Sequence, residues 1–293
     1  MLLLKHILVA TDFSQVATAA LRHALGIATR CHSAVSLVHV IDARLYGMAP
    51  DGMAVAVECA ERDAELMMEQ LHREGVINGP SPEVTIEVGP VWQTISAVIR
   101  ERCPGLLVLG THGRSGFPKL FLGSVAECAF REAPCPVLTV GPHVRSSKAS
   151  GAQARHFLVP TDLSAEASGA LLYGMSLAKA DGGEVTLLHV LKPRTGRAGE
   201  TEPSASAAMN QLAKFLNECP DTATIVRPRV EFGVPASTII AVGEQMHCDL
   251  VVMGLRAWST DGAPMWRTAY EVVIHARCPV LSMKSPARCV SGP

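Results

Sequence analysis

Short apolar runs alternate with longer amphipathic segments along this chain. In the first half, runs rich in valine, leucine and isoleucine lie near residues 5–10, 34–40, 83–88, 105–109 and 136–140. Segments with helical spacing lie between them, near 14–30, 53–74, 91–102 and 123–132. Because the apolar runs lack clean alternation, we expect strands buried on both faces, as in a parallel sheet covered by helices. The pattern predicts a doubly wound α/β domain, which binds ligands beyond the carboxyl ends of its strands.

The same pattern occurs twice in the chain. The segment KHILVATDFS at 5–14 returns as RHFLVPTDLS at 155–164, and SLVHV at 36–40 returns as TLLHV at 186–190. Later matches are LVLG with VVMG, ending at Gly110 and Gly254, and CPVL, beginning at Cys135 and Cys278. We therefore expect two tandem copies of one domain, at 1–143 and 154–287, joined by a polar, turn-prone linker near 142–154. Each copy has the common size of a single domain.

Composition narrows the class of protein. Apolar residues make up 48% of the chain and charged residues 18%, as in a globular protein. With 26 basic and 27 acidic residues and no basic run, nucleic acid is not an expected partner. Lys5 and His6 interrupt the opening MLLL, and no apolar stretch is long enough to span a bilayer, so we expect a cytoplasmic protein. Nine scattered cysteines without a Cys-x-x-Cys pair favour reduced thiols over a zinc site.

A glycine-lined loop lies between a strand and a helix in the first copy. It reads Gly110-Thr111-His112-Gly113, then nine residues, then Gly123-Ser124. Glycine allows close approach of the backbone, and the first turn of a helix offers unpaired N–H groups and a positive dipole end to an anion. Arg114 and Lys119 lie within the loop and could neutralise phosphate oxygens. The loop is neither a Walker motif nor a Gly-x-Gly-x-x-Gly motif, so a plain surface loop with a helix cap stays an alternative.

Taken together, these motifs resemble the universal stress protein superfamily in a tandem two-domain form. The resemblance rests on ATDFS at 10–14, His39-Val40, the Gly-x2-Gly-x9-Gly-Ser spacing, and SVAE at 124–127 leading to APCPV at 133–137. It covers essentially the whole chain. It implies two five-stranded parallel sheets with strand order 3-2-1-4-5, similar to the adenine nucleotide alpha hydrolase fold. It also implies that ATP is bound by those members that keep the glycine motif.

The resemblance assigns a role to each matching position of the first copy. Thr11 and Asp12, after Ala10, would hold the adenine and ribose end, and Val40 would line the adenine pocket. The remaining predicted ATP-binding residues would border the ribose and surround the triphosphate: Leu109, Gly110, Gly113, Arg114, Gly123, Ser124 and Val125. Alternatives stay open, because Asp12 could cap a helix beside Ser14 and Val40 could belong to the core. Whether magnesium or manganese accompanies the ATP is also open, and Ala10 replaces a proline that is frequent in the family.

The second copy keeps only part of this pattern. Thr161-Asp162 and Val190 persist, but Ala257 stands at the position of Gly113. The Gly-Ser pair becomes Arg267-Thr268, or Trp266-Arg267 if the one-residue deletion lies earlier. An arginine side chain would fill the space where bare backbone must meet phosphate, although Arg267 could itself pair with a phosphate. We therefore expect a degenerate second site and one nucleotide per chain.

The sequence offers little support for catalysis. It contains neither a Gly-x-Ser-x-Gly elbow nor a His-Glu-x-x-His motif, so we assign no catalytic and no metal-ligating residue. The leading hypothesis is an ATP-binding stress or signalling module whose bound state is read by an unidentified protein partner. The alternatives are a slow ATPase or adenylate-chemistry enzyme, and a structural dimerisation module with incidental nucleotide. Family members pair their fifth strands; here strands 136–140 and 279–284 could pair internally, giving a pseudo-dimer, and the chain could form a further homodimer.

Overall fold

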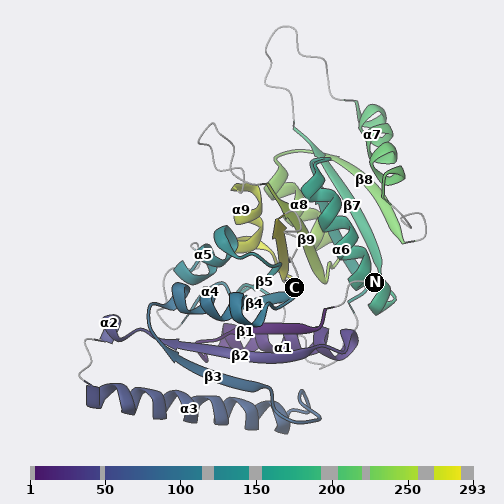
Figure 1. Ribbon diagram of the computed structural model, residues 1–293. Coiled ribbons are helices and arrows are strands. Elements are labelled where there is room, and N and C mark those ends of the chain that lie inside the picture. Colours follow the sequence, from purple (N-terminus) through teal and green to yellow (C-terminus); the bar gives the residue numbers. More distant parts are fainter. Residues whose placement is uncertain are drawn as a thin grey trace, which may run out of the picture. The chain divides into compact units, whose positions relative to one another are not determined.

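The structure is a computed structural model of the 293-residue chain (Figure 1). It describes residues 4–46, 50–113, 122–144, 154–192, 204–219, 225–256 and 267–284. The described residues as far as Pro142 form one compact unit, and those from Ala154 onward form another. We call these the N-terminal and the C-terminal domain; the exact limits 1–143 and 154–287 stay predictions.

The N-terminal domain is built on a parallel five-stranded sheet. Its strands are β1 (His6–Ala10), β2 (Ala34–Ile41), β3 (Glu83–Val88), β4 (Leu106–Gly110) and β5 (Val137–Val140). They lie in the order β3-β2-β1-β4-β5, which confirms the predicted order 3-2-1-4-5. The central strands carry no exposed side chain in their middles, since Leu8 and Leu107 are fully buried. Burial on both faces explains why these runs show no alternation of apolar and polar residues.

Helices cover both faces of this sheet. They are α1 (Gln15–Cys31), α2 (Ala43–Tyr46), α3 (Pro50–Arg73), α4 (Val91–Arg102) and α5 (Ser124–Glu132). Right-handed crossovers place α1 and α3 on one face, and α4 and α5 on the other, as Figure 1 shows. The short α2 was not predicted, and α3 begins three residues before the expected residue 53.

The C-terminal domain repeats this arrangement. Its strands are β6 (His156–Thr161), β7 (Glu184–Leu191), β8 (Val226–Phe232), β9 (Leu250–Leu255) and β10 (Val280–Lys284), in the order β8-β7-β6-β9-β10. All neighbouring pairs within this set are parallel. Its helices are α6 (Ala165–Asp181), α7 (Ala205–Asn217), α8 (Pro235–Gln245) and α9 (Arg267–His275). The fold class expected from the sequence is thus confirmed in both copies.

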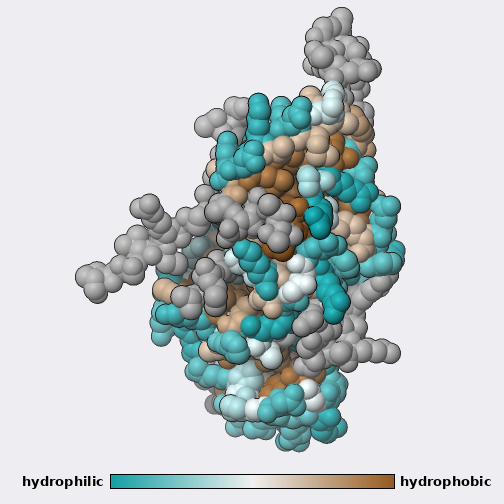
Figure 2. All heavy atoms as spheres, turned by 90° about the vertical axis from the view of Figure 1, so that its right-hand side faces the viewer, coloured by the Kyte–Doolittle hydropathy of each residue, from teal (hydrophilic) through white to brown (hydrophobic). Residues whose placement is uncertain are grey.

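Polar and charged side chains form much of the described surface on the face shown in Figure 2, with hydrophobic side chains between them. Among the described residues, no helix combines the length and the apolar character needed to cross a membrane. The proposed pairing of residues 136–140 with 279–284 stays a prediction.

Candidate functional site

In the N-terminal domain, the predicted site residues come from strands that end at one edge of the sheet. Ala10, the last residue of β1, lies in register between Val38 of β2 and Leu109 of β4. Val40 lies two residues further along β2 and is half-buried, whereas Leu109 is buried. Because β1 is the central strand, the residues that follow it are flanked by the ends of β2 and β4.

The turn after β1 holds Asp12 in a defined position. Phe13 has a positive φ of 60°, and its N–H donates to Thr11 Oγ1 at 3.0 Å. The Ser14 N–H donates to Asp12 Oδ1 at 3.1 Å, and Ser14 Oγ in turn caps α1 by accepting from the Ala17 N–H at 3.2 Å. A bulky residue in the left-handed region is strained, and such strain gathers at functional sites. The capping residue is thus Ser14, while Asp12 braces the turn through one carboxylate oxygen.

His39 fixes the same turn from the neighbouring strand. Its Nδ1 lies 2.8 Å from the carbonyl oxygen of Thr11, which can only accept, so Nδ1 carries the proton and donates. The rings of Phe13 and His39 are 4.7 Å apart. The repeated His-Val dipeptide in both copies signalled a shared role for this histidine. The contribution of Phe13 was missed, because no sequence pattern announces a positive φ at phenylalanine.

Gly113 lies directly against the carboxylate of Asp12. A Cβ atom at residue 113 would stand 2.6 Å from Asp12 Oδ2, which is closer than atoms pack. Glycine here therefore lets the loop pass the carboxylate without displacing it. Of the loop residues predicted from the sequence, Arg114 and Lys119 lie outside the described residues.

The start of α5 lies at the same edge of the sheet. Its N-cap, Gly123, offers no side-chain cap to the first turn, and a Cβ there would lie 3.1 Å from the carbonyl oxygen of Thr111. The Gly123 N–H donates to that oxygen at 2.8 Å, while the Thr111 N–H donates to Val140 O at 2.9 Å. The first turn contains Ser124, which is exposed, and Val125, which is half-buried. Its N–H groups therefore suit an anion.

Gly110 has a structural role besides its predicted place beside the ribose. A Cβ at residue 110 would lie 2.9 Å from Val16 Cγ1 and 3.3 Å from the backbone nitrogen of Ala17. The missing side chain thus allows α1 to approach the end of β4 closely.

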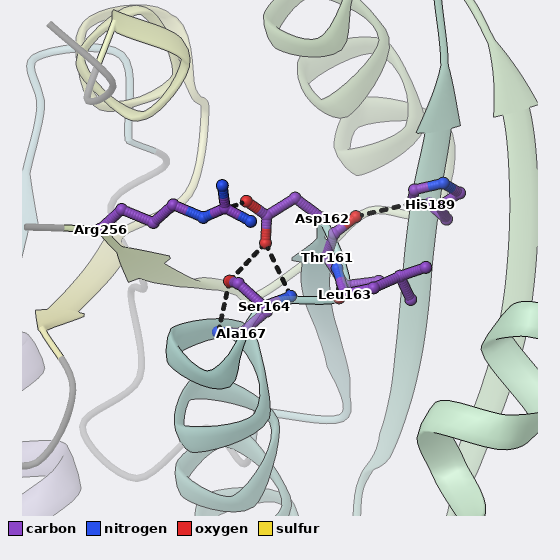
Figure 3. Close-up of polar contacts among 7 residues, drawn as sticks. All are labelled: Thr161, Asp162, Leu163, Ser164, Ala167, His189 and Arg256. Carbon is purple, nitrogen blue, oxygen red and sulfur yellow. Dashed lines mark hydrogen bonds and ion pairs between the residues drawn. The ribbon is translucent and has the colours of Figure 1, made fainter. Parts of the chain in front are cut away.

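The C-terminal domain builds the same turn after its central strand (Figure 3). Leu163 has a φ of 64°, and its N–H donates to Thr161 Oγ1 at 2.9 Å. The Ser164 N–H donates to Asp162 Oδ1 at 3.1 Å, and His189 Nδ1 donates to the Thr161 carbonyl oxygen at 2.8 Å. The three hydrogen bonds that hold this turn therefore agree in length between the two domains to within 0.1 Å.

The residues on the other side of the aspartate differ between the domains. Arg256, two residues after Gly254, stands where the first copy has His112, and its Nε lies 2.9 Å from Asp162 Oδ2 (Figure 3). Helices α5 and α9 end at Glu132 and His275, each three residues before the repeated Cys-Pro-Val-Leu, so counting back along the sequence pairs Trp266-Arg267 with Gly123-Ser124. The Arg267 side chain is directed to Glu271, with Nε 3.7 Å from Oε1. Ala257, Trp258 and Trp266 lie outside the described residues.

A hollow of about 280 Å³ lies at the carboxyl end of the C-terminal sheet. Apolar side chains from β7, α8 and β9 form part of its wall, among them Leu188, Val190, Ile239 and Met253. Its polar lining residues are Thr161, Asp162, His189, Lys192, Arg256 and Thr268.

The part of the chain that the structure describes shows no evident metal site. Among the described residues, no three His, Cys, Asp or Glu side chains gather as metal ligands would. His112, the one candidate base near the predicted phosphate loop, has its Nδ1 2.9 Å from Thr111 Oγ1.

Comparison with known proteins agrees with this architecture. The model of the universal stress protein family matches the chain twice, at residues 4–141 and 153–284. A universal stress protein of Methanocaldococcus jannaschii is 30% identical over 149 residues, which cover 47% of this chain and 82% of that protein. A putative universal stress protein of Staphylococcus aureus is 32% identical over 143 residues, covering 48% and 86%.

Solved structures share the fold over almost the full length. A universal stress protein from Archaeoglobus fulgidus superposes with a TM-score of 0.69 at 23% identity, covering 96% of this chain and 98% of that one. A putative universal stress protein from Pseudomonas aeruginosa gives a TM-score of 0.63 at 18% identity, with coverage of 97% and 94%. With the family model matched in each half, the chain belongs to the universal stress protein family and carries its domain in tandem.

Proposed function

We propose that the N-terminal crevice binds ATP and that the chain acts as a nucleotide-dependent stress or signalling module. The observation that carries the proposal is the meeting of Asp12, Gly113 and the uncapped start of α5 at one edge of the sheet. A carboxylate can accept hydrogen bonds from ribose hydroxyls, and helix N–H groups can receive phosphate. The half-buried Val40 would present an apolar face to the purine.

The triphosphate would lie along backbone rather than side chains. Glycine at 113 and 123 leaves space beside the loop and the start of α5. A Cβ at 113 would meet the Asp12 carboxylate, and a Cβ at 123 would meet the Thr111 carbonyl oxygen. Since no metal-ligand cluster is present among the residues that the structure describes, an accompanying magnesium or manganese ion would be held mainly by phosphate oxygens. Arg114 would add positive charge to this loop.

The test is calorimetric titration of the full chain with ATP. Gly123→Arg should abolish binding, because the side chain would enter the space of the phosphates and its Cβ already lies 3.1 Å from Thr111 O. Gly79→Arg is the matched control, since a Cβ at Gly79 meets no atom within 4 Å. Unchanged affinity in Gly123→Arg, with the fold retained by circular dichroism, would refute the site.

Native mass spectrometry of the purified chain gives a second, independent measurement. We expect one ATP for each chain. Two bound triphosphates would show that the C-terminal domain also accepts the polyphosphate. Saturable ATP turnover that disappears in Asp12→Ala would favour an enzyme over a binding module.

A further inference from the structure

The two domains share the nucleoside half of the crevice but not the phosphate half. Thr161, Asp162 and His189 reproduce the geometry of Thr11, Asp12 and His39, with matching hydrogen bonds of 2.8–3.1 Å. Val190 lines the C-terminal hollow at the position that corresponds to Val40. The residues that would hold a nucleoside in the N-terminal domain therefore have counterparts in the C-terminal domain.

Two positive side chains lie at the carboxyl end of the C-terminal sheet. Lys192 follows β7 and Arg256 follows β9, and both line the hollow. Since β7 and β9 flank the central β6, these two cations lie on either side of Asp162, which follows β6. The corresponding residues of the first copy are Asp42 and His112. Among the described residues, the lining of the hollow thus carries two cations and one carboxylate.

The ion pair between Asp162 and Arg256 is exposed, so a ligand could separate the two side chains. The side chains are 55% and 40% exposed, and a pair so exposed contributes little to stability. An arginine guanidinium forms stronger, two-pronged bonds with a phosphate. A ligand phosphate could therefore take Arg256 from Asp162, and the released carboxylate could then accept from a ribose, as Asp12 does in the proposed function.

We propose that the C-terminal crevice binds a nucleoside monophosphate, with Arg256 exchanged from Asp162 to the single phosphate. A triphosphate is disfavoured, because Trp266-Arg267 replaces the Gly-Ser pair and the hollow, about 280 Å³, is at the small end of ligand pockets. The choice of a nucleoside rests on the proposed function of the first crevice. One chain would then hold a triphosphate and a monophosphate at separate sites, and so respond to their ratio.

The test is calorimetric titration of the Gly123→Arg chain with AMP, in which the N-terminal site is blocked. We expect one AMP for each chain. Adding Arg256→Ala should weaken AMP binding by about tenfold or more, the loss of a charge-assisted hydrogen bond. Arg277→Ala is the matched control: that arginine also pairs with one carboxylate, Glu244 at 2.8 Å, but does not line the hollow. AMP binding that is unaffected by Arg256→Ala overturns the proposal.

Adenosine and inorganic phosphate test the nucleoside and the phosphate of the ligand separately. Adenosine should bind more weakly than AMP, and Arg256→Ala should not weaken adenosine binding, because the substitution leaves Asp162 available to the ribose. Inorganic phosphate should compete poorly with AMP. Phosphate that competes as well as AMP would overturn the nucleoside assignment.

Hydrogen–deuterium exchange of the unmodified chain with AMP keeps the proposal testable if Gly123→Arg misfolds. Protection is expected in peptides covering 161–164, 188–192 and 254–256, and protection confined to the N-terminal domain would refute it. Failure of ATP to bind, together with Arg256-dependent AMP binding, would refute the proposed function alone.

Discussion

The turns that follow the central strands of the two domains have matching hydrogen bonds, whereas the residues that approach the aspartate of each turn differ. In the N-terminal domain, Asp12 faces the bare backbone of Gly113, whereas in the C-terminal domain Asp162 pairs with Arg256 at 2.9 Å. Glycine at 113 lets the loop backbone lie against one carboxylate, while an arginine side chain forms an ion pair with the other. The comparison teaches that one fold can keep the turn after its central strand while the residues on the other side of the carboxylate change.

The largest effect we expect comes from the glycine that the two domains share. In Gly254→Ala, the new Cβ would collide with the carbonyl oxygen of Glu166 and lie 2.8 Å from the Ala167 nitrogen, both fixed backbone atoms of α6. The free energy of unfolding should fall by about 3 kcal/mol, the upper range for overpacking. Gly110→Ala meets mainly the Val16 side chain and should cost about 1 kcal/mol. Urea denaturation monitored for each domain measures both, and equal costs would contradict the comparison.

Acid should destabilise the N-terminal domain through His23. Burial, with a smaller effect of the nearby positive Arg30, lowers the pKa of His23 to about 4, whereas the corresponding residue of α6 is Tyr173. Between pH 6.5 and about 4 the unfolded chain binds the proton more readily, so the free energy of unfolding falls as the pH falls through this window. The loss should approach about 3 kcal/mol, because each pKa unit corresponds to about 1.4 kcal/mol.

His23→Gln isolates this effect from the titration of carboxylates. Urea denaturation at stepped pH, resolved by hydrogen exchange into the two domains, should show a flatter profile for the N-terminal domain of the variant. An unchanged profile would mean that His23 is protonated in the folded chain.

Gly113→Ala gives the N-terminal domain the residue that the C-terminal domain has at the matching position, Ala257. The added Cβ would stand 2.6 Å from Asp12 Oδ2 and displace the carboxylate. We expect ATP affinity to fall about tenfold, or roughly 1.4 kcal/mol, with stability unchanged. Calorimetry measures the affinity, and Gly79→Ala is the control because its Cβ meets open space. An unchanged ATP affinity in Gly113→Ala would show that Asp12 takes no part in ATP binding.

The helix caps should show the smallest difference between the domains. Ser14 and Ser164 each accept from the N–H three residues on, at 3.2 and 3.3 Å. Ser14→Ala and Ser164→Ala should each lower the free energy of unfolding by about 1 kcal/mol, the usual cost of an N-cap. A difference between the two much larger than a few tenths of a kcal/mol would show that the shared turn is not equivalent after all.

Local sequence patterns predicted the fold well, while the assignment of the ATP-binding residues stays a prediction. The buried apolar runs located the strands, and the repeated motifs located the strand ends, because both depend on residues adjacent in the chain. The Asp162–Arg256 pair could not be predicted, since it joins residues 94 positions apart whose contact depends on the order of β6 and β9. The positive φ of Phe13 was equally hidden, because it is imposed by Thr11 and His39 rather than preferred by phenylalanine.

Phe13 and Leu163 have a further consequence for the history of the chain. Each is a large side chain in a backbone conformation that favours glycine, and each is held by the same threonine and histidine contacts. Two independent origins of so costly an arrangement would be hard to explain. We infer that the ancestral single domain already had this turn before its gene was duplicated, and that the glycine-bearing loop diverged afterwards.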